Sequence, residues 1–164
     1  MIAFERGNVS FRSRVAAVIL HKGHILLGGE PDIPVWTLPG GGIDLLESSH
    51  AALERELREE LGVGVRIERL LWVSEVFFES DGKAHHEIGF YFLVVPLDAP
   101  HLFELGREFL AVEGGPNPVT LRWFRLEDIK HLALYPKFLR TALQSLPSTP
   151  QQMIDVESSF LHTG

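Results

Sequence analysis

Three glutamates within residues 41–63 (GGIDLLESSHAALERELREELGV) have the type and spacing for divalent-metal chemistry. Residues 51–61 are mostly strong helix formers, so Glu56, Glu59 and Glu60 are expected within about 100° of one another on one helix. Two carboxylates about 5 Å apart repel by about 3 kcal/mol at an effective dielectric constant near 20. A hard cation such as Mg²⁺ or Mn²⁺ relieves this repulsion by taking carboxylate oxygens as ligands. A solvated acidic face with helical salt bridges is the competing interpretation, and it is favoured for such a run taken alone.

The segment that must position these glutamates carries its own start and stop signals. Ser48 is a favourable N-cap, and Gly62 is a natural left-handed end for a helix. The neighbouring stripe is apolar and should face the core, because its members recur every four residues: Leu53, Leu57 and Leu61. The glutamates are therefore expected at the border between core and solvent.

Residues around the acidic patch can orient it. Arg55 precedes Glu59 by one turn and relieves part of the repulsion, while Glu47 at the helix start is placed to hold Arg55. Just upstream lie three glycines that let the backbone approach a ligand closely: Gly40, Gly41 and Gly42. Taken alone, this glycine run is better explained as a structural turn. It is not a P-loop, because no Gly-Lys-Ser/Thr follows it.

The complete spacing changes the balance between these interpretations. It resembles, position for position, the signature of the Nudix hydrolases, which cleave a nucleoside diphosphate linked to another moiety. All nine defined positions match: Gly41, Glu47, Arg55, Glu56, Leu57, Glu59, Glu60, Gly62 and Val63. With average residue usage, such a match arises by chance at a given register with a probability on the order of 10⁻¹⁰. One flanking position departs from the pattern, since Leu46 stands where many members have glycine.

The resemblance implies a metal-assisted hydrolysis of a P–O–P bridge. Mg²⁺ or Mn²⁺ neutralises charge on the diphosphate and lowers the pKa of a bound water, whose proton a carboxylate accepts. The implied metal ligands are three side chains and one backbone carbonyl: Glu56, Glu59, Glu60 and Gly40.

The residue that acts as general base varies within the family. Glu59 is our choice inside the signature, and Glu113, which precedes a Gly-Gly-Pro run, leads among the loop candidates. Glu104 and Glu108 are weaker candidates, and for every loop glutamate a solvated surface charge is the more common role. Arg55 and Glu47 complete the expected catalytic set by orienting the helix carboxylates.

Contacts to the substrate are expected from the glycine loop and from two strands. The candidates are Gly41, Gly42, Arg14 and Glu87. A surface role is at least as common for a strand-start arginine such as Arg14. The tryptophans at positions 36, 72 and 123 could stack a base, but core packing is the better explanation for each.

Composition limits the partners. The chain has 164 residues with 45% hydrophobic and 23% charged residues, as expected for one globular domain, and it contains no cysteine. No apolar run is long enough for a membrane helix, and residues 1–14 lack the apolar stretch of a signal peptide, so a cytoplasmic location is expected. The net charge of −7 argues against stable nucleic-acid binding. A small nucleotide remains compatible, because divalent metal screens both its phosphates and the carboxylates. A homodimer is a possible assembly.

The order of predicted elements fits an α/β fold. Residues 11–20 and 24–27 form a predicted hairpin, residues 63–79 and 87–97 a longer one around Asp81-Gly82, and residues 120–125 a further strand. Residues 126–131 and 136–146 are expected to be helical, with helices on both sides of the sheet. This order resembles the Nudix α/β/α sandwich, with a mixed β-sheet between helices, over residues 13–146. We therefore expect a Nudix domain at 1–146 and a tail at 147–164, with at most a short docked segment.

Two classes of function remain open. The first is a metal-dependent pyrophosphohydrolase. The second is a nucleotide-binding sensor or regulator of the same fold that does not turn over substrate. The complete carboxylate set favours the enzyme, because noncatalytic relatives commonly lose it. Markers that accompany CoA, NADH, ADP-ribose and dinucleoside polyphosphate specificity are missing from the expected positions, which mildly favours nucleoside triphosphates or a broad specificity.

Overall fold

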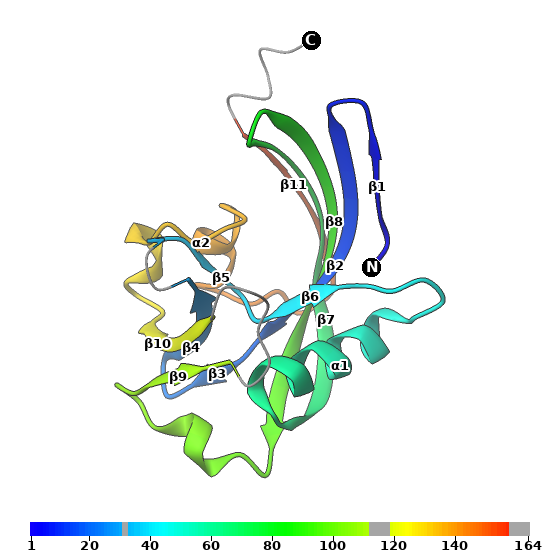
Figure 1. Cartoon of the computed structure of the whole chain (residues 1–164). Helices are drawn as coiled ribbons and strands as arrows, with labels where there is room; N and C mark the ends of the chain where they lie inside the picture. Colours follow the sequence, from blue (N-terminus) through cyan, green and yellow to red (C-terminus); the bar gives the residue numbers. More distant parts are fainter. Residues whose placement is uncertain (31–32, 112–118, 158–164) are drawn as a thin grey trace.

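The computed structural model describes residues 1–30, 33–111 and 119–157, and it arranges their strands in two sheets (Figure 1). The first sheet has the order β1-β2-β8-β7-β11, with β6 paired to β2; the second has the order β3-β4-β10-β9, with β5 paired to β4. Strands β2 and β8 are parallel, as are β7 and β11, whereas β7 and β8 form an antiparallel hairpin. The first sheet is therefore mixed, as the sequence predicts.

The strand bounds follow the hydrophobic runs of the sequence closely. The first sheet contains β1 (Ala3–Arg6), β2 (Val9–Val18), β6 (Gly40–Gly42), β7 (Gly64–Ser80), β8 (Lys83–Leu97) and β11 (Gln151–Val156). The second contains β3 (Leu20–His21), β4 (His24–Gly29), β5 (Trp36–Thr37), β9 (Glu108–Leu110) and β10 (Thr120–Arg125). The long hairpin and the strand at 120–125 are confirmed, whereas the first predicted hairpin is present only where β3 pairs with β4, because β2 belongs to the other sheet. Strands β1 and β9 were not predicted, and β6 and β11 lie where the sequence analysis expects a glycine loop and a tail.

The helices after β10 are shorter than the sequence analysis expects. Helix α1 (Ser49–Leu61) has its predicted length, but residues 126–131 contribute only the 3₁₀ turn η2 (Ile129–His131), and residues 136–146 only α2 (Leu139–Ala142). A further 3₁₀ turn, η1 (Pro100–Phe103), follows β8. Around α2 the chain winds largely through i→i+3 bonds, such as Leu139 N–H to the Pro136 carbonyl at 3.2 Å, which is the tighter 3₁₀ pattern. Within the described residues, no helix is long and apolar enough to cross a membrane.

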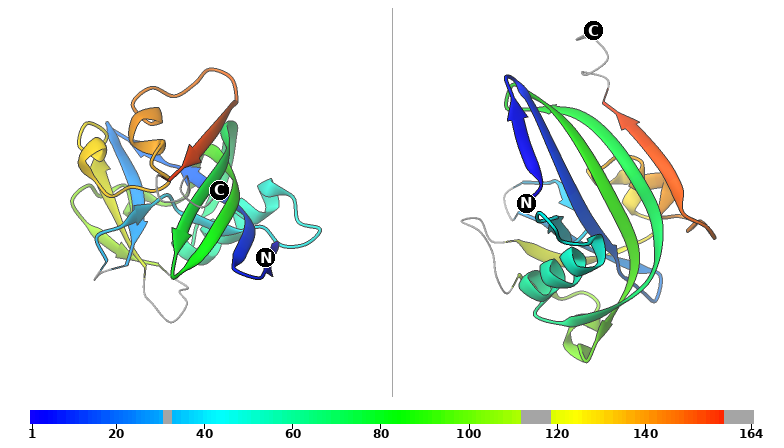
Figure 2. Two further views of the ribbon diagram at one scale, coloured as in Figure 1. Left: turned by 90° about the horizontal axis from the view of Figure 1, so that it is seen from above. Right: turned by 90° about the vertical axis from the view of Figure 1, so that its right-hand side faces the viewer.

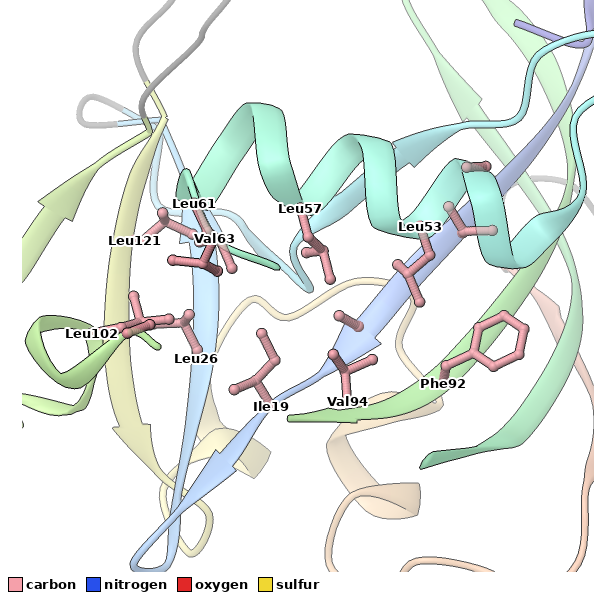
Figure 3. Packing of buried hydrophobic residues seen from close by; sticks show 14 of the residues in the cluster. Ile19, Leu26, Leu53, Leu57, Leu61, Val63, Phe92, Val94, Leu102 and Leu121 are labelled. Carbon is pink, nitrogen blue, oxygen red and sulfur yellow. The ribbon is translucent and has the colours of Figure 1, made fainter. Parts of the chain in front are cut away.

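Two apolar layers cover the two faces of the mixed sheet. On one face Leu53 and Leu57 of α1 belong to one apolar cluster with Val94 and Phe92 of β8, all of them almost fully buried (Figure 3). On the other face the segment around α2 packs through Leu139 and its neighbours onto buried residues that include Ala16, Val18, Trp72 and Tyr91. Figure 2 shows α1 and α2 on opposite sides of this sheet. Helices on both sides are thus confirmed, and they explain why β2 is apolar on consecutive positions.

The segment after residue 146 contributes to the sheet. Residues 151–156 form β11, which pairs in parallel with β7 from Gln151 opposite Trp72 to Val156 opposite Phe77. In Figure 1 this strand lies along the edge of the long curved sheet, on the side of α2. The short docked segment allowed within the expected tail is therefore a sheet strand.

Candidate active site

Helix α1 presents the acidic patch at the border of the core, as its sequence predicts. The Ser48 hydroxyl accepts a hydrogen bond from the Ala51 N–H at 3.2 Å, and Gly62 ends the helix with φ of 68°. The leucine stripe of α1 is buried, so the glutamates lie beside it. Their side chains differ in exposure, because Glu56 is 17% and Glu59 is 42% exposed.

Arg55 is the centre of the hydrogen-bond network that holds this patch. Its Nε and Nη2 donate to the two carboxylate oxygens of Glu47 at 3.0 and 2.9 Å, and Nη2 also donates to the Gly42 carbonyl at 2.9 Å. Its Nη1 donates to Glu56 at 2.8 Å and to Glu59 at 3.5 Å. A single guanidinium thus ties the loop before the helix to two of the three helix carboxylates. The expected pairing of Arg55 with Glu47 is present as a bidentate contact.

The charges in this network shift the pKa values of its members. The hydrogen bond from Arg55, followed by the backbone N–H of Asp44, lowers the pKa of Glu47 to about 2. Hydrogen bonding to Glu47 in turn raises the pKa of Arg55. Glu47 therefore stays ionised at any pH near neutrality and remains bound to Arg55.

Glu60 sits in a different environment from the other two glutamates. Its Oε2 accepts a hydrogen bond from the Gly40 N–H at 2.9 Å. Burial, with the negative charges of Glu56 and Glu59 adding to it, raises the pKa of Glu60 to about 7. The patch thus holds excess negative charge where water is scarce. Such a site favours a bound cation.

The glycines of β6 permit this close approach of backbone and carboxylates. A side chain at Gly41 would place its Cβ 2.2 Å from a carboxylate oxygen of Glu56. At Gly40 the backbone has φ of 139°, and a Cβ would lie 2.2 Å from the Val15 carbonyl oxygen. The Gly42 carbonyl accepts from Arg55, and a Cβ at Gly42 would collide with the Met1 side chain. Glycine is therefore required at Gly40, where both the backbone contact and φ exclude a side chain, whereas a Cβ at Gly41 or Gly42 would displace the end of a side chain.

Leu46 departs from the signature, and its backbone explains why glycine is common there. Its φ is 65°, in the left-handed region that favours glycine, and its side chain is fully exposed together with that of Leu45. Leu46 thus holds a backbone conformation that glycine adopts more readily, at the cost of backbone strain.

The donor set suits a hard divalent metal, although it is not gathered into a cage. No cluster of three or more His, Cys, Asp or Glu side chains that could hold a metal occurs among the described residues. Glu56 and Glu59 are turned toward Arg55, and Glu60 toward the Gly40 N–H. The chemistry of the donors fits Mg²⁺. Three carboxylates that repel one another lie on one helix face beside a backbone turn, and Mg²⁺ takes carboxylate oxygens as ligands.

A pocket of about 360 Å³ opens on the face of the sheet opposite α1. Arg12, Arg14 and Glu87 line it from β2 and β8, where Arg12 is the cross-strand partner of Glu87. The Arg12 Nε donates to Glu87 Oε2 at 2.5 Å, and the Glu87 side chain is only 3% exposed. Glu87 thus lines the pocket while bound to Arg12, and its contact with a substrate stays a prediction.

Arg14 connects this pocket with the acidic patch. Burial alone would lower its pKa, but the nearby negative charges of Glu87, Glu60 and Glu56 contribute to raising it. Its Nε is enclosed and has no hydrogen-bond partner among the described residues. A buried cation with an unfilled donor, next to carboxylates that can hold metal, is suited to an anionic ligand.

The remaining candidates lie apart from this centre. Glu104 pairs with Arg107 at 2.9 Å, and Glu108 with Arg122 at 3.5 Å, in both cases at the surface. Glu113 lies outside the described residues. Two of the tryptophans pack as expected: Trp72 is fully buried, and Trp123 donates from Nε1 to the Leu102 carbonyl at 2.7 Å.

The sequence analysis missed several residues that line the pocket. Asp155 and Glu157 come from β11 and the residue after it, and Tyr135 from the turn before α2. The alternation of Met153, Asp155 and Glu157 with outward residues was a signal for a strand. It was too short to overrule the surrounding prolines and serines.

Comparisons with known proteins agree with this geometry. A family model described as NUDIX domain matches residues 10–146. The chain is 42% identical over 69 residues to the low-salt glycan biosynthesis protein Agl8 of Haloferax volcanii, covering 40% of this chain and 44% of that protein. It is 37% identical over 82 residues to an RNA pyrophosphohydrolase of Nitratiruptor sp., covering 44% and 53%. The chain thus spans about half the length of these curated relatives.

Solved structures share the fold over more of the chain. A MutT NUDIX hydrolase from Burkholderia pseudomallei is 29% identical with a TM-score of 0.50, covering 71% of this chain and 84% of that one. A MutT protein from Bacillus halodurans has a TM-score of 0.60 at 16% identity, covering 91% and 92%. At that identity the second similarity concerns the fold alone.

Proposed function

Because the chain belongs to the NUDIX domain family, we propose that it is a metal-dependent hydrolase of the P–O–P bridge in a nucleoside diphosphate joined to another group. The observation that carries the proposal is the complete carboxylate set on α1, with Arg55 holding two of its members and Glu47 holding Arg55. A non-catalytic sensor of the same fold has no need of this set.

In this proposal Glu56, Glu59, Glu60 and the Gly40 carbonyl hold Mg²⁺ or Mn²⁺. The bound metal supplies charge neutralisation on the diphosphate and a water molecule of lowered pKa. Arg55 keeps the carboxylates oriented, because its contacts to Glu56 and Glu59 fix the outer side of the patch. Arg14 binds a phosphate oxygen, which satisfies its enclosed Nε.

Glu59 is the proposed general base. Of the two helix glutamates that contact Arg55, Glu59 is the more exposed. Its side chain is 42% exposed, so water reaches it. Its 3.5 Å contact to Arg55 is long, which leaves the carboxylate free to accept a proton. Glu113 is the alternative base and lies outside the described residues.

For the substrate we propose nucleoside triphosphates or a broad range of nucleoside diphosphate derivatives. The missing specificity markers support this proposal. The names of the relatives do not narrow it, because the matched segments cover about half of each relative.

The test is a hydrolysis screen of the purified chain over nucleoside triphosphates, nucleotide sugars, ADP-ribose and dinucleoside polyphosphates. Products are identified by chromatography with Mg²⁺, with Mn²⁺ and with excess EDTA. We expect turnover with metal, almost none with EDTA, and a strong loss in Glu59→Gln. Full activity in EDTA would refute the metal mechanism. Binding of nucleotide without any hydrolysis would instead support the sensor.

A further inference from the structure

The pocket opposite α1 has a wall that lies outside the matched family region. The family match ends at residue 146, whereas Asp155 of β11 and Glu157 after it line the pocket. Strand β11 points Met153, Asp155 and Glu157 to one side, where they are partly buried, and leaves Gln152, Ile154 and Val156 exposed. The two acids therefore belong to the pocket and not to the outer surface.

The charges of this pocket are unevenly distributed. Arg14 lies on the side of the acidic patch, since it interacts electrostatically with Glu56 and Glu60. Asp155 lies on β11 and Glu157 directly follows it, and β11 is separated from β2 by β7 and β8 in the sheet. A ligand spanning the pocket thus meets Arg14 and the Arg12–Glu87 pair at one end, and Asp155 and Glu157 at the other, where Lys137 pairs with Glu157.

The acidic wall retains capacity to accept hydrogen bonds. Asp155 Oδ2 accepts from the Phe138 N–H at 3.2 Å, and Glu157 contacts the Lys137 Nζ at 3.4 Å. An ionised carboxylate offers about four acceptor positions, so these contacts leave most of them available. Phe78 and Tyr135 add aromatic surface to the pocket.

We propose that β11 is a specificity element of the substrate site, in which Asp155 and Glu157 accept hydrogen bonds from the donor-bearing end of a nucleoside while Arg14 holds its phosphate. The inference rests on the proposed function, because that function places the scissile diphosphate beside Arg14. A further phosphate is disfavoured at the acidic wall by like-charge repulsion. The donors are either an exocyclic amino group of the base or hydroxyl groups of the sugar, since both present N–H or O–H to a carboxylate.

Matched substrate pairs separate these two donors. Hydrolysis by the full chain is measured for ATP against ITP, GTP against ITP and CTP against UTP, which differ in amino groups, and for each ribonucleotide against its 2′-deoxy form. The variants are Asp155→Asn and Glu157→Gln. The control is Ile154→Thr, which changes the outward face of the same strand and keeps a β-branched residue.

We expect the wild-type protein to favour the member that carries the amino group or the 2′-hydroxyl group in at least one pair by about tenfold or more in KM, as for a hydrogen bond to a charged group. Asp155→Asn should bring that ratio toward one, while Ile154→Thr leaves it unchanged. If Asp155→Asn loses the preference within the substrate pairs that differ in an amino group, the donor is that amino group. If it loses the preference within the 2′ pairs, the donor is the sugar hydroxyl. A merely structural role of Asp155 would slow all substrates by a common factor, and that result overturns the proposal. Glu157→Gln decides the question if Asp155→Asn does not fold.

A calorimetric measurement keeps this inference distinct from the proposed function. Binding of AMP, IMP, CMP and UMP, each beside its 2′-deoxy form, is measured for the wild-type protein and Asp155→Asn, with no turnover required. If the chain hydrolyses no substrate but binds the amino-bearing nucleotides more tightly through Asp155, the proposed role of Asp155 in selectivity is supported and the enzyme proposal fails. Equal binding of all four nucleotides by both proteins, together with no preference in the 2′ pairs, refutes the proposal that β11 is a specificity element.

Discussion

Glu60→Gln should make the metal-free protein more stable at alkaline pH, although it removes a metal ligand. The pKa of Glu60 rises from its ordinary value of 4.5 to about 7, chiefly through burial. Between pH 4.5 and 7, Glu60 is ionised in the unfolded state but still protonated in the folded state. The free energy of unfolding therefore falls as pH rises through this window. At about 1.4 kcal/mol per pH unit, ionised Glu60 costs the fold about 3 kcal/mol above pH 7.

Glutamine keeps the acceptor for the Gly40 N–H and removes the charge. The variant should therefore match the wild-type protein near pH 4.5 and exceed it by up to about 3 kcal/mol at pH 8. The measurement is urea unfolding in EDTA across that range, with Glu54→Gln as control, since Glu54 is exposed on the same helix. Added Mg²⁺ should reverse the order, because a ligand for the folded state stabilises the wild-type protein more. If Glu60→Gln is no more stable than Glu54→Gln at pH 8 in EDTA, the buried charge of Glu60 does not destabilise the metal-free fold, and the reasoning is refuted.

Three further changes test other parts of the site. Arg55→Ala should reduce turnover by about 10 to 100-fold while circular dichroism stays unchanged, because it frees Glu47 and the helix carboxylates without opening the core; a wild-type rate would show that the network is not needed. Gly41→Ala should weaken Mg²⁺ affinity in calorimetry, because its Cβ would lie 2.2 Å from the Glu56 carboxylate, and an unchanged affinity would exclude Glu56 as a ligand. Leu46→Gly should raise the free energy of unfolding by about 0.5 to 1 kcal/mol in urea titrations, since it relieves a positive φ, whereas a loss would show that the exposed leucine has a contact partner.

Local signals in the sequence were sufficient to predict the helix that carries the glutamates. The N-cap at Ser48, the stop at Gly62 and the leucine period each act within a few residues, and the structure reproduces all of them. The pairing of Arg55 with Glu47 was accessible for the same reason, because the family spacing places both residues around one helix start. The raised pKa of Glu60 was not accessible, since it depends on burial and on the Gly40 N–H.

Features that depend on tertiary pairing were not visible in the sequence. Strand β11 pairs with residues of β7 about 80 positions earlier in the chain, so its six residues, whose alternation is too short to identify a strand, gain their structure largely from this partner. The short α2 is a similar case, because helix-forming residues at 136–146 wind mainly through tighter turns against the sheet. The pocket acids were missed together with the strand that carries them.

The parallel pairing of β11 with β7 also determines when the site is completed during folding. Every other strand of the mixed sheet precedes β11 in the chain, and the pairing closes a loop of about 80 residues. Because domains emerge from the ribosome N-terminal part first, a nascent chain can form the helix with its carboxylates before the strand with Asp155 has been synthesised. Such an intermediate would carry the hydrolytic groups without the wall proposed to discriminate between nucleotides, so selectivity would be the last property that the growing protein acquires.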